Sequence, residues 1–89
     1  MGASGWRVEI TKDAEQDLER IGEPAKIRIL EKIRWFKDNF DQVRHEPLGG
    51  KWGGFFKLRV GDWRIVYEIE HIFRLVTIHR IDRRDKIYK

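Results

Sequence analysis

Cysteine is absent from this chain of 89 residues, so neither disulfide bonds nor a thiolate metal site can stabilise its fold. The single serine, Ser4, lies in the small-residue start of the chain, and this excludes a catalytic Ser triad. The three histidines fall at no metal-ligand spacing, and the sequence contains no phosphate-binding loop or dinucleotide fingerprint. We therefore expect no metal and no cofactor.

Long hydrophobic runs are also missing, since no apolar stretch approaches the roughly 18 residues that span a bilayer. Residues 1–5 have neither the basic nor the apolar region of a signal peptide, and we interpret them as a disordered terminus or a cloning remnant. The remaining residues, 6–89, are enough for one domain with one small core. We expect a cytoplasmic protein without membrane contact.

Positive charge is concentrated in the C-terminal half of the chain. The formal net charge is +4, but residues 1–50 carry a net charge of −1 and residues 51–89 carry +5. The positive field therefore belongs to the second half of the fold. This distribution favours a phosphate-rich partner.

The hydrophobic pattern predicts one strand, two helices and then three strands. Thr11 is a candidate N-cap for the first helix, and Gly22 is predicted to end it. The second helix is predicted to bury Ile29, Ile33, Phe36 and Phe40, with Ile27 and Leu30 alongside. We expect an α+β fold, β-α-α-β-β-β, with both helices packed on a mainly antiparallel four-stranded sheet. The predicted strands are 6–10, 55–60, 63–69 and 73–80, the second helix is 24–40, and the loop is 42–54.

Gly61 and Asp62 suit a tight turn between two alternating runs, 55–60 and 63–69. Such a turn places Arg59 opposite Arg64 and Lys57 opposite Val66, so the three cations share one face with no acid beside them. The other face is apolar. Two interpretations of the three cations stay open from spacing alone, a polyanion-binding surface or a solvated outer face of the sheet.

The side chains that the last strand adds to this face depend on the turn near Glu70 and His71. A two-residue turn puts His79 on the face of Arg64, whereas a three-residue turn puts Arg80 there. The sequence leaves both open.

Three segments together resemble the RelE/ParE family of toxins from type II toxin–antitoxin systems. They are Pro47-Leu48-x-Gly50, the hairpin Leu58-Arg-Val-Gly-Asp-Trp-Arg-Ile-Val-Tyr67, and His79-Arg80 followed by Ile87-Tyr-Lys89. The resemblance covers nearly the whole chain after residue 5. It implies a microbial-ribonuclease-like fold. For the RelE branch it implies cleavage of mRNA in the ribosomal A site and so inhibition of translation, and for the ParE branch inhibition of DNA gyrase. An inactive member that only binds antitoxin or RNA is the third alternative.

The resemblance also implies roles for individual residues. Lys57 is the candidate for proton removal, Arg64 for stabilising the phosphorane, and Tyr88 for stacking on or orienting a base. Arg80 belongs with this catalytic set, although Arg83 or Arg84 is an alternative for its place. The expected phosphate-binding residues are Arg59, Arg83, Arg84 and Lys51.

One position departs from the family. Ribosome-dependent members carry a further Lys two positions before the one that Lys57 matches, and here that position is Phe55. Trp52, in the Gly-rich loop, is a candidate for contact with a base or antitoxin, with packing at the core edge as its alternative.

The resemblance implies three kinds of partner. They are a cognate antitoxin, the ribosome with its mRNA, and operator DNA that the toxin–antitoxin complex binds through the antitoxin. The basic face and the apolar positions around Trp35 and Trp52 favour an acidic, amphipathic antitoxin segment that folds on binding.

Overall fold

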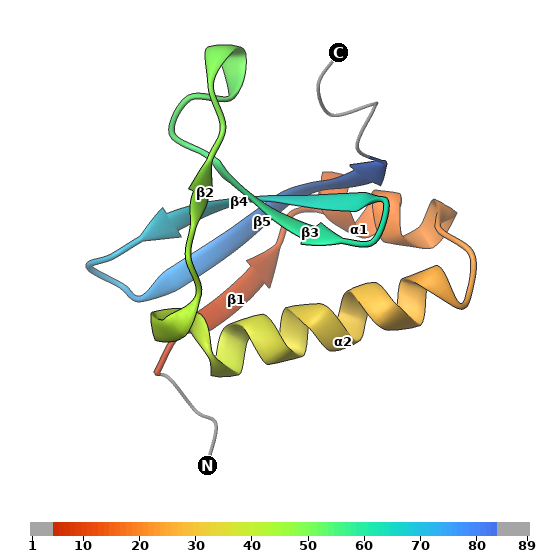
Figure 1. The fold of residues 1–89 in the computed structure, drawn as a ribbon, viewed down its shortest axis with the longest axis horizontal. Coiled ribbons are helices and arrows are strands. Elements are labelled where there is room, and N and C mark those ends of the chain that lie inside the picture. The colour runs from red at the N-terminus through yellow and green to blue at the C-terminus, as the bar shows by residue number, and fades with distance from the viewer. Residues whose placement is uncertain (1–4, 84–89) are drawn as a thin grey trace.

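The computed structural model describes residues 5–83 of the chain. Two helices and a five-stranded sheet form an α+β fold (Figure 1), which confirms the predicted class. The strand order is β1-β5-β4-β3-β2, with β1 parallel to β5 and all other neighbours antiparallel. The elements are β1 (Arg7–Ile10), α1 (Lys12–Arg20), α2 (Ala25–Asp38), β2 (Glu46–Pro47), β3 (Phe56–Val60), β4 (Trp63–Glu70) and β5 (Leu75–Arg83), with 3-10 turns at Phe40–Gln42 and Gly50–Trp52.

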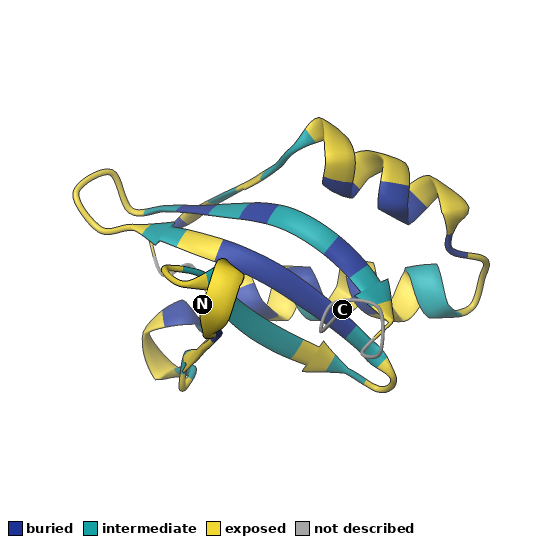
Figure 2. Ribbon diagram, turned by 90° about the horizontal axis from the view of Figure 1, so that it is seen from above, coloured by how far each residue is buried: buried dark blue, intermediate teal, exposed yellow. Residues whose placement is uncertain are grey.

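The main core lies between the helices and one face of the sheet. Figure 2 shows buried residues concentrated in the central strands β4 and β5 and on the inward sides of the helices. Phe36 of α2 contacts Tyr67 of β4 with ring centroids 4.8 Å apart, and both side chains are fully buried. We call the side of the sheet that carries Tyr67 the core face and the opposite side the open face.

The helix boundaries follow from local chemistry. The Thr11 hydroxyl accepts a hydrogen bond from the Ala14 backbone N–H at 3.2 Å, as predicted for an N-cap. The helix α1 ends at Arg20, before Gly22. In α2 the predicted stripe Ile29, Ile33 and Phe36 is buried.

The expectation that Ile27 and Leu30 join the core was wrong. Their exposed fractions are 47% and 43% because they lie on the outer side of α2, away from the stripe that contacts the sheet. Trp35 lies on that outer side too, with 47% exposed.

The sheet has one strand more than predicted. Glu46 and Pro47 pair with Lys57 and Phe56 inside the segment expected to be a loop. A two-residue strand carries no alternating pattern that could reveal it in the sequence. The chain after it returns to the sheet, because the Leu48 N–H donates to the Phe55 carbonyl at 2.9 Å.

The central hairpin has the predicted register, with Arg59 opposite Arg64 and Lys57 opposite Val66. The next turn, residues 71–74, is longer than either length considered, and a bulge follows it in β5. The register passes from Tyr67 opposite Ile78 to Val66 opposite Arg80, so His79 is the extra residue. Both His79 and Arg80 therefore come to the open face, where a choice between them had been expected.

Candidate functional site

Lys57, Arg59 and Arg64 project from adjacent strands on the open face, and we call them the cationic face. Arg59 and Arg64 are direct cross-strand partners, and Lys57 lies one pleat from Arg59 along β3. Arg59 is exposed and Lys57 is half-buried. Because all three residues lie on paired strands, the backbone holds their Cα atoms close together.

Arg64 is buried, with only 2% of its surface exposed. Among residues 5–83, its Nε has no hydrogen-bond partner and no carboxylate lies within 4.0 Å of its guanidinium. Arg64 is therefore not part of a solvated outer face, which was one of the two interpretations of these cations. Period-2 alternation places Arg64 on the open face correctly, but alternation does not tell which parts of that face other segments cover.

The open face is not free of acids, contrary to expectation. Asp82 lies opposite Arg64 in β5, and Glu46 lies opposite Lys57 in β2. Asp82 accepts a hydrogen bond from the Arg83 backbone N–H at 2.7 Å. The cationic face therefore has a carboxylate at each flank.

Glu46 and Lys57 also line a depression of about 510 Å³, together with Arg44, His45 and Pro47. Glu46 was not among the predicted site residues because it lies in the segment predicted to be a loop, and only strand pairing brings it beside Lys57. The position of Glu46 directly before the Pro47-Leu48 motif was the one available signal.

His45 and Tyr67 anchor this depression to the core. Nδ1 of His45 and the Tyr67 hydroxyl share a hydrogen bond of 2.6 Å, and the His45 ring packs against Phe40 at 4.3 Å between centroids. Burial lowers the pKa of His45, whereas burial and the nearby Glu46 raise the pKa of Tyr67. Tyr67 therefore stays protonated, and the hydrogen bond that it shares with His45 fixes the chain just before Glu46.

The Arg80 side chain turns to the edge of the sheet and not toward Arg64. Its Nε donates to Oδ2 of Asp17 at 2.9 Å, and that same oxygen accepts the Ile81 backbone N–H at 2.9 Å. The hydrogen bond to Asp17 raises the pKa of Arg80. Beyond Ile78 the strand β5 has no pairing with β1, so buried Asp17 of α1 satisfies the exposed backbone there.

Three ring side chains line up on the other half of the open face, and we call them the aromatic row. Trp52 meets Phe55 edge-on with centroids 5.5 Å apart, and Phe55 meets His79 edge-on at 5.0 Å. Trp52 and Phe55 pack on buried Leu48 and Val66. Nε2 of His79 lies 2.9 Å from a carboxylate oxygen of Glu68.

The other predicted site residues are scattered. Lys51 is exposed in the 3-10 turn of the loop, and Arg83 packs its guanidinium 5.8 Å from the Trp63 ring. Since Arg83 is the cross-strand partner of Trp63, it shares the core face and not the cationic face. Arg84 and Tyr88 lie outside the described residues.

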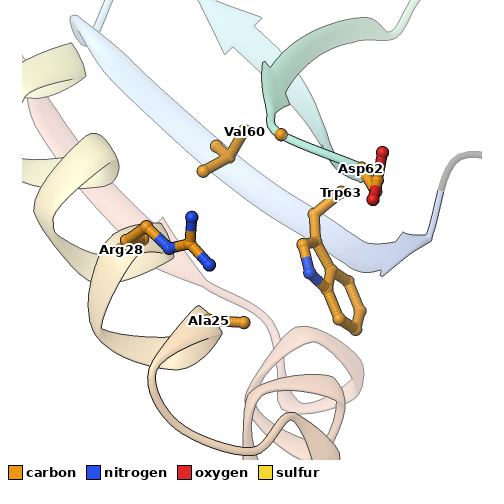
Figure 3. A pocket seen from close by; sticks show the side chains of 6 residues that line it. Ala25, Arg28, Val60, Asp62 and Trp63 are labelled. Carbon is orange, nitrogen blue, oxygen red and sulfur yellow. The ribbon is translucent and has the colours of Figure 1, made fainter.

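A second hollow of about 180 Å³ opens on the core face, between the start of α2 and the central hairpin. Figure 3 shows Arg28 of α2 reaching toward Val60 and Trp63 of the hairpin. This hollow lies on the side of the sheet opposite to the cationic face.

Among residues 5–83, no group of three or more His, Cys, Asp or Glu side chains is arranged to hold a metal ion. No helix in this part of the chain is long and apolar enough to cross a bilayer.

This architecture is that of RelE-like toxins. The E. coli toxin RelE, as a double mutant in the free state, has a TM-score of 0.73 at 13% identity, covering 93% of this chain and 90% of its own. The Mycobacterium tuberculosis toxin–antitoxin complex RelBE2 gives 0.68 at 28% identity, covering 89% and 91%. A YoeB/ParE toxin from Agrobacterium tumefaciens gives 0.69 at 20% identity, covering 86% and 96%. No curated protein matches the chain significantly.

The family model described as the ParE toxin of the type II toxin–antitoxin system parDE matches residues 8–88. The chain therefore belongs to this toxin family, within the RelE/ParE superfamily.

Proposed function

We propose that this toxin is a ribosome-dependent endoribonuclease that cleaves mRNA in the A site. The observation that carries the proposal is Arg64, a buried cation on a rigid strand with no described counter-ion. A buried charge without a partner is unfavourable for folding, so its presence calls for a functional reason. A phosphate that becomes more negative in the transition state is the partner such a cation suits.

The reaction requires removal of the 2′ proton, positive charge beside the phosphorane, and a proton for the leaving oxygen. The RNA 2′-hydroxyl attacks the adjacent phosphorus as it loses its proton, and the bond from phosphorus to the 5′ oxygen breaks. The products are a 2′,3′-cyclic phosphate and a 5′-hydroxyl, and the leaving oxygen takes up one proton. Arg64 and Lys57 neutralise the phosphorane, while Arg59 holds a neighbouring phosphate from its exposed position.

We assign removal of the 2′ proton to Glu46 in preference to Lys57. A charged ammonium offers three donors and no acceptor, whereas a carboxylate is an acceptor. Glu46 is exposed and is the cross-strand partner of Lys57, so it stands beside the cations that hold the phosphate. Glu46→Gln keeps the size of the side chain and removes the base.

Arg80 takes no direct part in this scheme because Asp17 already holds it. Tyr88 keeps its proposed role of stacking on or orienting a base, and Arg84 remains a candidate for phosphate binding.

The ribosome is the natural second participant. The depression beside Lys57 and Glu46 is open, and the described residues form no enclosed cleft there that could position RNA. Ribosomal RNA would hold the codon in line with the cationic face, and its phosphates would meet the basic surface.

The proposed inhibitor is a cognate antitoxin with an acidic, amphipathic segment. RelBE2 was solved as a toxin–antitoxin complex. On this chain Ile27, Leu30 and Trp35 expose apolar surface on the outer side of α2, and the cationic face attracts acidic residues. We propose that operator DNA is then bound through the antitoxin.

Gyrase inhibition is the second candidate, favoured by the ParE description of the matching family model. A pure inhibitor makes no use of a base beside a phosphate-binding cation. Glu46→Gln would then leave toxicity unchanged, which gives the two candidates opposite expectations.

Primer extension on translated mRNA after induction of the protein tests the proposal. Cuts phased with codons, absent when the antitoxin is co-expressed, support the nuclease. Relaxed plasmid DNA with uncut mRNA would establish gyrase inhibition instead, and normal growth on strong expression of the toxin alone would contradict both.

A further inference from the structure

We propose that the aromatic row of Trp52, Phe55 and His79 is a platform that stacks one unpaired RNA base next to the cationic face. This subsite rests on the proposed nuclease function. It adds a position at which the toxin contacts a base of the RNA, in addition to the phosphates.

The Phe55 ring lies beside the cationic face in a fixed orientation. Phe55 sits two residues before Lys57, so its ring lies on the same face, about 6.8 Å along the chain. It is half-exposed, and its neighbours Trp52 and His79 meet it edge-on at 85° and 87°. Edge-on neighbours hold a ring upright and fix its orientation without stacking over it.

Buried apolar side chains support the rings of the aromatic row from the interior side. Trp52 and Phe55 rest on Leu48 and Val66, which are 8% and 0% exposed. Val66 is the cross-strand partner of Lys57 and lies two residues from Arg64 on β4. The apolar patch and the cations are therefore continuous on one rigid sheet.

Charge complementarity identifies the occupant. A ligand that covers both the aromatic row and the cationic face must present a flat apolar surface to the rings and a negative charge to the neighbouring Lys and Arg side chains. A nucleotide in a single strand has both, because its base stacks on aromatic rings while its phosphate meets Lys or Arg. A protein segment with an aromatic and an acidic side chain is the alternative that the experiment must separate.

An abasic scan tests the platform. Short single-stranded RNAs with 2′-O-methyl groups, which prevent attack by the 2′ oxygen, are labelled and titrated with the protein by fluorescence anisotropy. Each RNA lacks one base at a different position. We expect removal of one particular base to weaken binding roughly tenfold, while removal of the others has little effect.

Phe55→Leu keeps an apolar side chain on Leu48 and Val66 and removes the ring. This variant should bind the intact RNA about tenfold more weakly and lose its sensitivity to the missing base, as expected when both changes remove one contact. Phe73→Leu is the matched control, because Phe73 is 66% exposed at the far β4–β5 turn. Thermal melting checks that both variants fold.

A flat scan with the wild-type protein would overturn the platform, even if Phe55→Leu failed to fold. An unchanged scan profile in folded Phe55→Leu would overturn it as well. The cleavage proposal is tested separately. A base-dependent binding profile together with uncut mRNA would refute cleavage but would still support the platform. Displacement of the RNA only by an aromatic-acidic peptide, with no base dependence, would assign the row to a protein partner and refute the platform.

Discussion

Arg64 lies directly opposite Arg59 across the central hairpin, and the two like charges have unequal environments. Arg59 is exposed, whereas Arg64 is 2% exposed. Like charges directly opposite one another destabilise a sheet, and burial of one of them adds a desolvation cost. A bound phosphate would relieve both effects, which is the physical basis of the proposed function.

Arg64→Met should therefore separate stability from activity. Methionine fills similar space without a charge, so the free energy of unfolding should stay the same or rise by about 1 kcal/mol. Loss of the cation from the transition state should slow cleavage on the order of 100-fold or more. Urea unfolding and a cleavage assay measure the two effects.

Arg59→Met is the matched control for that comparison. Because Arg59 is exposed, its replacement should change the free energy of unfolding by less than about 0.5 kcal/mol. Strong destabilisation by Arg64→Met would show that the buried guanidinium has a structural partner, contrary to our account.

We expect Asp17 to stabilise the fold and to take no part in catalysis. Asp17→Ala removes the acceptor of both Arg80 and the Ile81 backbone N–H, so we expect a loss of about 2–3 kcal/mol and a fall in Tm of roughly 10–20 °C. Glu19→Ala, an exposed change on the same helix, should leave Tm within a few degrees. Equal melting temperatures of Asp17→Ala and wild type would free Arg80 for a role in catalysis.

His45 should make stability depend on pH. Burial lowers its pKa from the ordinary 6.5, so the unfolded chain binds the proton more tightly than the folded chain. The contribution is present above about pH 6.5 and is lost as pH falls below it. His45→Gln cannot titrate, so its free energy of unfolding should fall less than that of wild type between pH 7 and pH 5. Parallel pH profiles for the two proteins would contradict this.

Binding to RNA should weaken with salt. If Lys57, Arg59 and Arg64 each meet a phosphate of a single strand, the slope of log affinity against log salt should be about −2. Arg59→Met should reduce the slope by roughly 0.7. A slope near zero in the wild-type protein would place RNA binding elsewhere.

Local pattern was enough to predict the hairpin and the helices. Gly61 takes a positive φ of 59° at the predicted turn, and alternation on both sides then fixes the partners of Lys57 and Arg59. Thr11 and the stripe of α2 were found for similar reasons, since caps and period-3.6 faces depend on near neighbours in sequence.

Long-range packing explains what was missed. Glu46 reaches Lys57 only through a two-residue strand, and Asp17 reaches Arg80 across 63 positions of sequence. The burial of Arg64 also depends on long-range packing. Period-2 alternation assigns a residue to one face of the sheet but does not show whether other segments cover that face. The bulge at His79 shifts the register by one residue, and no single residue type marks such a bulge.

The most direct test of the account is cleavage of mRNA on purified, programmed ribosomes by wild-type protein and by folded Arg64→Met, under single-turnover conditions. We predict cuts within the A-site codon by the wild-type toxin, with a 2′,3′-cyclic phosphate end, and a rate lower by about 100-fold in the variant. Equal rates for the two proteins, or no cuts by wild type while it inhibits gyrase, would contradict the account.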